Sequence, residues 1–145
     1  MMKQSYHLNG IQQMGIGVPN VPEIWSWYRK AFGLDVKIFE EAAPAPLMTR
    51  YTGDVVHHRT ATLALNMAGG GGMEIWQYTS KEPVKPATNP VFGDLGIYAV
   101  KIKCPDVNAA FEKLQREESK LHSYHGGGEH FWVTDPWENR FDLVP

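Results

Sequence analysis

Hydrophobic and polar residues alternate over the segment IQQMGIGV near the start of the chain. A period of two predicts a β-strand with one buried face. Beyond this segment, apolar residues recur at helical spacing, and Asn20 with Glu23 three positions later is typical of a helix N-terminus. Gly33 is suited to ending that helix. We therefore expect a strand followed by a helix at about residues 21–33.

The same order recurs in the second half of the chain. GIYAVKIKC alternates like a strand, Asp106 can cap a helix, and apolar residues then repeat the spacing of the first helix. The offset between the halves is constant, because 86 positions separate Asn20 from Asp106 and Val21 from Val107. This repeat predicts a second helix at about residues 106–118.

Three short segments typical of strands follow each predicted helix. They are DVKIFEE, RTATLALNM and GMEIWQY in the first half, and KLHSYH, HFWVTD and RFDLV in the second. Gly69 to Gly72 predict a tight hairpin connection, and DPWEN predicts another turn. The glycine run is a poor phosphate-binding loop, because no GK[ST] follows it and the next segment is a strand.

The polar, proline-rich segment KEPVKPATNP lies between the halves and predicts a linker. The pattern therefore predicts an α+β fold in which the order strand, helix, strand, strand, strand occurs twice. We expect one domain over residues 1–145, with module one at about 9–80, a linker at about 81–92 and module two at about 93–145.

Composition and charge narrow the classes of function. The 145 residues are 43% hydrophobic, enough for one buried core, and the formal charge is only −2. Such a weak, dispersed charge does not favour binding to nucleic acid or to an anionic membrane surface. No apolar run approaches a membrane span, and the first residues lack a signal-peptide core, so we expect a cytoplasmic protein. The single cysteine, Cys104, fits the apolar pattern and is interpreted as a core thiol.

Four motifs in this order resemble the vicinal oxygen chelate superfamily, which includes glyoxalase I, bleomycin-resistance proteins and extradiol dioxygenases. IQQMGIGVPNV followed by WYRKAFGLDV resembles the opening of its module, GIYAVKIKCPDVNAAFEKL resembles the second opening, and FWVTDPWENRFDLV resembles its closing hairpin. The resemblance covers nearly the whole chain. It implies that the two βαβββ modules pair into a curved, cup-forming mixed sheet, and it also implies a homodimer.

In that superfamily, metal ligands come from the first and fourth strands of both modules. By the motif match, Gln13 and Glu74 stand at the ligand positions of module one, and Asp142 stands at the terminal acidic position of module two. The remaining position, usually histidine, is Ala99. The resemblance thus implies an incomplete ligand set, and we expect these four positions to converge on one cavity.

The three remaining candidates offer only oxygen donors, which favour Mg²⁺ or Mn²⁺ over zinc or nickel. An open coordination shell can polarise a carbonyl and stabilise an enediolate, with Glu74 or Asp142 as the base. The leading hypothesis is therefore a glyoxalase-like lyase or isomerase acting on a small carbonyl compound. Extradiol ring cleavage is disfavoured, because its iron site uses two histidines and one carboxylate.

A competing hypothesis starts from Lys101, which shares a strand face with Ala99 two residues earlier. Its ammonium can pair with Glu74 or Asp142 and replace the metal. The site would then have no cofactor. This hypothesis predicts a metal-free protein that binds or sequesters a small molecule, as bleomycin-resistance proteins do.

Trp76 and Tyr78 share the strand face of Glu74 and are candidate walls for a flat or apolar ligand, although they are almost as readily explained as filling of the cup. Among the six histidines, none stands at a superfamily ligand position. His125 and His130 remain as weak acid–base candidates, since the glycine-rich segment between them can fold over a cup.

Overall fold

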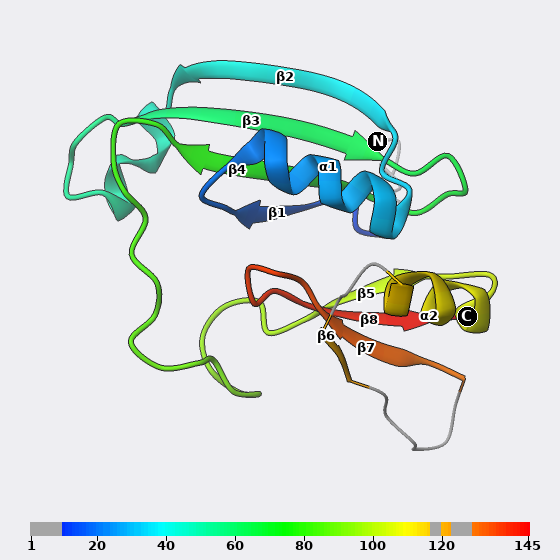
Figure 1. Ribbon diagram of the computed structural model, residues 1–145. Coiled ribbons are helices and arrows are strands. Elements are labelled where there is room, and N and C mark those ends of the chain that lie inside the picture. Colours follow the sequence, from blue (N-terminus) through cyan, green and yellow to red (C-terminus); the bar gives the residue numbers. More distant parts are fainter. Residues whose placement is uncertain (1–9, 117–119, 123–128) are drawn as a thin grey trace, which may run out of the picture. The chain divides into compact units, whose positions relative to one another are not determined.

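The computed structural model describes residues 10–116, 120–122 and 129–145. The chain forms two compact units, unit 1 up to Glu82 and unit 2 from Pro83 to Pro145. Each unit contains one open, curved four-stranded sheet and one α-helix (Figure 1). The fold is therefore a mixed α+β fold in which a βαβββ order occurs twice, as the sequence predicted.

Unit 1 follows the predicted order, with one short 3₁₀ helix added. Its elements are β1 (Gln13–Gly17), α1 (Val21–Phe32), β2 (Val36–Pro44), η1 (Pro46–Tyr51), β3 (His58–Leu65) and β4 (Gly72–Tyr78). The strand order in the sheet is β1-β4-β3-β2, with β1 parallel to β4 and the other pairs antiparallel. Helix α1 packs on one face of this sheet, against β3 and β4 (Figure 1).

The ends of α1 confirm the capping residues expected from the sequence. The Asn20 side chain accepts a hydrogen bond from the Glu23 backbone N–H at 3.1 Å. At the other end, Gly33 adopts a left-handed conformation with φ of 65° and donates its N–H to the Arg29 carbonyl at 3.0 Å. A left-handed residue at this position favours glycine. Local hydrogen bonds at Asn20 and Gly33 thus determine both ends of the helix.

Alternation along β4 separates its two faces. Met73 and Ile75 are buried, whereas Glu74 and Trp76 between and after them are half-buried. Because α1 packs on β4, the buried residues form the helix-facing side, and the half-buried ones form a helix-free face. The helix-free face is the side on which the candidate residues of unit 1 lie.

Unit 2 repeats the arrangement with shorter strands. Its elements are β5 (Val100–Lys103), α2 (Val107–Arg116), β6 (Lys120–His122), β7 (Phe131–Thr134) and β8 (Arg140–Val144), and the strand order is β5-β8-β7-β6. The Asp106 carboxylate accepts a hydrogen bond from the Ala109 N–H at 2.9 Å, which confirms the predicted cap. The predicted end of this helix, residues 117 and 118, lies outside the described residues. Cys104, expected in the core, is only half-buried.

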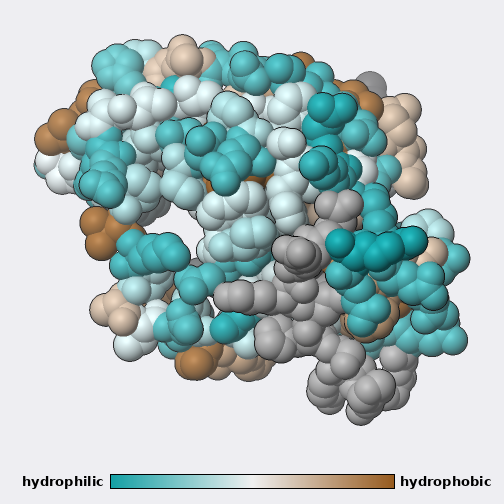
Figure 2. All heavy atoms as spheres, in the orientation of Figure 1, coloured by the Kyte–Doolittle hydropathy of each residue, from teal (hydrophilic) through white to brown (hydrophobic). Residues whose placement is uncertain are grey.

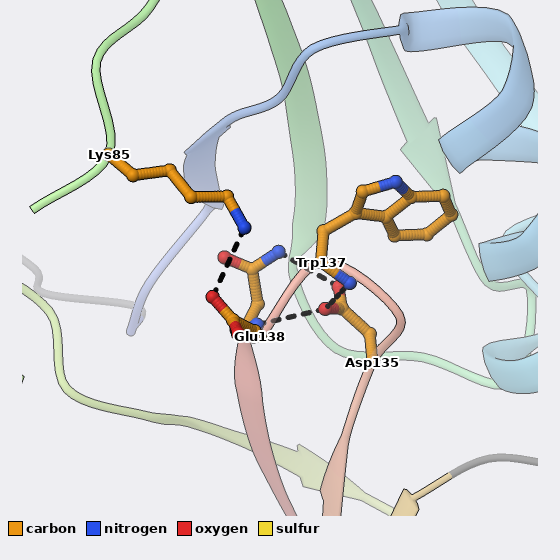
Figure 3. A network of polar contacts seen from close by, with 5 residues as sticks. Lys85, Asp135, Trp137 and Glu138 are labelled. Carbon is orange, nitrogen blue, oxygen red and sulfur yellow. Dashed lines mark hydrogen bonds and ion pairs between the residues drawn. The ribbon is translucent and has the colours of Figure 1, made fainter. Parts of the chain in front are cut away.

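The DPWEN turn between β7 and β8 is organised by one buried carboxylate. Asp135 is 1% exposed and accepts hydrogen bonds from the backbone N–H groups of Trp137 at 2.9 Å and Asn139 at 2.8 Å, and from the Asn139 side chain at 2.8 Å. Glu138 has a positive φ of 75° and pairs with Lys85 at 3.2 Å (Figure 3). The Asp135 carboxylate therefore stabilises a turn that contains no glycine, in addition to the backbone hydrogen bonds of the turn.

Apolar side chains are also present at the surface. Figure 2 shows hydrophobic residues in separate patches on the visible side. Several of the exposed apolar residues belong to the segment that leads into β5, namely Val84, Val91, Phe92, Leu95 and Ile97. No described helix is long and apolar enough to cross a membrane.

Candidate functional site

The two metal-ligand candidates of unit 1, Gln13 and Glu74, are in contact. The Gln13 side-chain amide donates a hydrogen bond to Glu74 Oε2 at 2.7 Å. The parallel pairing of β1 with β4 produces this contact, because Gln13 lies opposite Gly72 and Gly15 lies opposite Glu74. Both side chains lie on the helix-free face. The register of β1 against β4 thus brings together the two positions that the motif match had identified.

Aromatic rings extend the same face of β4. Trp76 and Tyr78 meet edge to face with ring centroids 4.5 Å apart, and the His57 ring lies 5.7 Å from that of Tyr78. On β1, a side chain at Gly15 or Gly17 would meet no described atom within 4 Å of its Cβ outside the adjacent residues. The helix-free face of unit 1 thus combines a carboxylate, a half-buried aromatic wall and open space over the glycines.

The candidate carboxylate of unit 2, Asp142, is deeply buried. Its side chain is 1% exposed, and Oδ1 lies 2.6 Å from Nδ1 of His130. Its other oxygen, Oδ2, lies 3.2 Å from the Lys101 ammonium, whose side chain is 72% exposed. The pairing of β5 with β8 places Lys101 directly opposite Asp142. One buried carboxylate therefore holds an imidazole and an ammonium group, one on each oxygen.

The two oxygens of Asp142 are not equally satisfied. Oδ1 has the hydrogen bond to His130, whereas Oδ2 is buried with no hydrogen-bond partner among the described residues. The contact of Oδ2 with Lys101 is thus an ion pair without the geometry of a hydrogen bond. A buried acceptor without a hydrogen bond is costly, so Oδ2 is suited to accept one from a further group.

His130 lies closer to the candidate site than the sequence indicated. The sequence kept it beside His125 as a weak acid–base candidate next to the glycine run; in the structure it directly precedes β7, and its ring contacts Asp142. Strand alternation could have predicted this contact. Trp132 lies opposite Asp142 in the β7–β8 hairpin, and His130, two residues before Trp132, faces the same side. His125 lies outside the described residues.

The donor set fits a metal ion in unit 1 better than in unit 2. Gln13 and Glu74 place an amide and a carboxylate side by side, and both can offer oxygen to a hard cation. In unit 2, Ala99 offers no side-chain donor, and the Lys101 ammonium beside Asp142 repels a cation. No three His, Cys, Asp or Glu side chains gather as a metal site within the described ranges. The convergence of Gln13, Glu74, Ala99 and Asp142 on one cavity stays a prediction.

Comparisons with known proteins identify the family. The sequence profile of the Glyoxalase/Bleomycin resistance protein/Dioxygenase superfamily matches residues 10–143, nearly the whole chain. The chain therefore belongs to this superfamily, as the motifs in the sequence indicated. No curated protein matches the chain.

Solved structures agree with that assignment at the level of the fold. A glyoxalase family protein from Bacillus cereus superposes with a TM-score of 0.74 at 13% identity, covering 95% of this chain and 94% of that one. The fosfomycin resistance protein FosX from Listeria monocytogenes, in a complex with Mn(II) and dihydroxypropylphosphonic acid, gives 0.59 at 12% identity and covers 95% and 93%. TioX from Micromonospora sp. ML1 gives 0.58 at 12% identity and covers 93% and 97%.

Proposed function

We propose that this chain is a metal-independent protein that binds a small organic molecule on the helix-free faces of its sheets. The observation that carries the proposal is the environment of Asp142. This residue stands where the superfamily resemblance implies a metal ligand, yet its carboxylate is held by the Lys101 ammonium and the His130 imidazole. Both carboxylate oxygens already have a neighbour that competes with a cation.

The Lys101 ammonium opposes metal binding by its charge. Two unit charges ~4 Å apart interact by about 4 kcal/mol at an effective dielectric of ~20. Lys101 is mostly exposed, so solvent screening and side-chain motion reduce that figure. Even a fraction of it weakens the affinity of a divalent ion severalfold, and Ala99 supplies no donor in compensation.

The helix-free face of unit 1 supplies the part of the site suited to a ligand. Trp76 and Tyr78 are half-buried and offer aromatic surface next to the Glu74 carboxylate. Flat or apolar ligands gain from such walls, while one or two polar groups fix their orientation. The partner expected from these features is a small molecule with a planar or apolar part and a hydrogen-bonding group.

A second candidate function is a Mg²⁺- or Mn²⁺-dependent lyase or isomerase acting on a small carbonyl compound. Two observations favour it: Gln13 and Glu74 already lie side by side, and the buried Oδ2 of Asp142 has no hydrogen bond within the described part of the chain. In this alternative, these side chains would supply oxygen ligands to the ion, and the ion would polarise the carbonyl of the substrate.

Metal content separates the two candidates. The protein is purified without chelator, its metals are quantified by mass spectrometry, and its thermal unfolding is followed with added Mn²⁺, Mg²⁺, Zn²⁺ and Ni²⁺. We expect far less than one ion per chain and an unchanged melting temperature. Stoichiometric Mn²⁺ or Mg²⁺, with a melting temperature that rises with ion concentration, would support the enzyme instead.

A further inference from the structure

We propose that Arg59 recognises the ligand on the helix-free face of unit 1 by binding an anionic oxygen group, a carboxylate or a phosphate, carried by a flat aromatic molecule. This inference rests on the small-molecule binding proposed above and names the class of ligand. It involves residues of unit 1 alone, and none of the candidate metal ligands takes part in the recognition.

Arg59 lies on the same sheet face as the aromatic wall. It pairs directly with Tyr78 across β3 and β4. Directly opposed residues of an antiparallel pair project to the same side, with Cβ atoms about 5 Å apart. Tyr78 in turn shares its face with Trp76, whose ring it meets edge to face with 4.5 Å between the centroids. A guanidinium group therefore lies at the end of the wall that these two rings form.

The guanidinium group of Arg59 is partly buried and is held by the neighbouring strand. Its side chain is 17% exposed, Nη1 donates a hydrogen bond to the Glu41 backbone carbonyl at 3.1 Å, and Nη2 forms an ion pair with the Glu41 carboxylate. Glu41 faces the same side, because it lies opposite Ala61, which lies opposite Trp76. The bond to a backbone oxygen orients the planar group before any ligand arrives, which lowers the cost of binding.

Arg59 retains hydrogen-bonding capacity for a ligand. A guanidinium group carries five N–H donors in one plane. The contacts with Glu41 use two of them, and no other partner of Arg59 occurs in the described part of the chain. Carboxylate and phosphate oxygens match this planar donor geometry and can accept two hydrogen bonds at once.

An anionic ligand can displace the side chain of Glu41 from this pair. The Glu41 side chain is 55% exposed, and ion pairs at such exposed positions contribute little to stability. Its carboxylate can therefore turn towards solvent at low cost, while its backbone carbonyl keeps the hydrogen bond from Nη1. The anionic group of the ligand then takes the place of the carboxylate beside Arg59.

The two ends of the aromatic wall differ in charge. Four residues separate Glu74 from Tyr78 on β4, a distance of about 13 Å along a strand. Distance and solvent both weaken the repulsion that Glu74 exerts on an anion beside Arg59. A flat ring system gains from contact with Trp76 and Tyr78, and an anionic group on it pairs with Arg59. These features identify the ligand as an aromatic carboxylic acid or an aromatic phosphate.

The test compares two matched probes, 2-naphthoate and its neutral amide, 2-naphthamide. Both are titrated into the full chain, and the shifts of the backbone amide signals in nitrogen-15 NMR spectra give the affinity and the place of binding. We expect 2-naphthoate to bind beside β3 and β4 about tenfold more tightly than 2-naphthamide. Arg59→Gln should abolish this preference and leave the affinity for 2-naphthamide unchanged.

Three further variants separate recognition by Arg59 from general effects. Glu41→Gln removes the competing carboxylate and should strengthen the binding of 2-naphthoate about threefold, a gain that a merely structural role of the pair would not produce. Arg59→Lys keeps the charge but loses the planar donors, so it should retain part of the preference. Arg29→Gln makes the same change of charge on α1 and should leave both affinities as in the wild type.

The other outcomes overturn the proposal in distinguishable ways. Equal affinity of the wild type for both probes, a preference that persists in Arg59→Gln, or an equal loss of both probes in that variant overturns the role of Arg59. Binding of 2-naphthamide beside β3 and β4 would still support the proposed function in those cases. If neither probe shifts the amide signals of these strands, the proposed function fails as well. Should Arg59→Gln not fold, the presence or absence of the gain in Glu41→Gln decides.

Discussion

The residue paired with the last-strand carboxylate differs between the two units. In unit 1, Glu74 on β4 lies opposite Gly15 on β1, whereas in unit 2, Asp142 on β8 lies opposite Lys101 on β5. The constant offset of 86 positions aligns Gly15 with Lys101. The same topology therefore presents an open position beside one carboxylate and an ammonium beside the other.

The residue at this strand position determines what can approach each carboxylate. Glycine leaves space over β1, so a ligand can approach Glu74, and the neutral Gln13 amide hydrogen-bonds the carboxylate. Lysine instead places a charge at Asp142, whose side chain is almost completely buried. Fold symmetry thus does not extend to the chemistry of the two faces, and a function assigned from topology alone would miss this.

The largest expected difference in stability concerns the turn before the last strand of each sheet. The β3–β4 connection turns with glycines at positive φ, including Gly70 at 91°, whereas the β7–β8 turn depends on the buried Asp135 carboxylate. We expect Asp135→Ala to lower the free energy of unfolding by about 3 kcal/mol, because several N–H donors lose their partner. Urea unfolding measures this value.

The matched change in unit 1 is Gly70→Ala, which should cost only about 1 kcal/mol for a left-handed alanine. Asp135→Asn is the conservative control and should retain part of the stability, since the amide oxygen still accepts hydrogen bonds. Equal losses in Asp135→Ala and Gly70→Ala would contradict the contrast between the hairpins.

Removing the helix cap should destabilise the two units by similar amounts. Asn20 and Asp106 each accept a hydrogen bond from a backbone N–H three residues later, at 3.1 Å and 2.9 Å. We expect Asn20→Ala and Asp106→Ala each to lower the free energy of unfolding by about 1 kcal/mol. Both are measured by urea unfolding, with Asn20→Ser and Asp106→Ser as controls that keep a capping oxygen. A loss confined to one unit would show that the two helix starts are not equivalent.

The smallest expected effect is the pH dependence of an exposed pair on the sheet of unit 1. A hydrogen bond from Lys37 to Glu40 at 2.9 Å, reinforced by the lysine charge, lowers the pKa of the Glu40 carboxyl below its ordinary value. The ionised form is thus favoured in the folded state. Its contribution to stability is present above the ordinary carboxyl pKa and is lost as the pH falls through the lowered one.

Glu40→Gln should therefore be slightly less stable than the wild type at neutral pH and equal to it in acid. Thermal unfolding across this pH range measures the difference. Lys37→Met should produce the same small loss, and the double variant should add nothing to it. A difference that grows towards acidic pH would contradict the direction of the pKa shift.

Short-range chemistry explains why so much of the fold was predictable. The Asn20 and Asp106 caps, the Gly33 helix end and the bounds of β4 are each determined by a few neighbouring residues. Strand alternation also placed Trp76 and Tyr78 on the face of Glu74, and the structure bears out that placement. Such features depend little on the rest of the molecule.

The candidate site was less predictable, because it depends on side-chain choices over long distances. Sequence allowed Lys101 to pair with Glu74 or with Asp142, and only the β5–β8 register decides for Asp142. His130 was kept only as a weak acid–base candidate beside the glycine run, while the register of β7 with β8 brings its ring to the Asp142 carboxylate. The sequence could not determine which carboxylate the long Lys101 side chain reaches, nor how His130 lies at the start of β7.

Calorimetric titration of Mn²⁺ and Mg²⁺ into chelator-treated wild type, Lys101→Ala and the control Lys103→Ala tests metal independence most directly. If the Lys101 ammonium takes the place of the cation at Asp142, the wild type and Lys103→Ala should show no binding heat. Removal of the ammonium in Lys101→Ala should then permit weak binding, because the buried carboxylate loses its positive neighbour. Tight binding by the wild type that Lys101→Ala leaves unchanged would contradict the account.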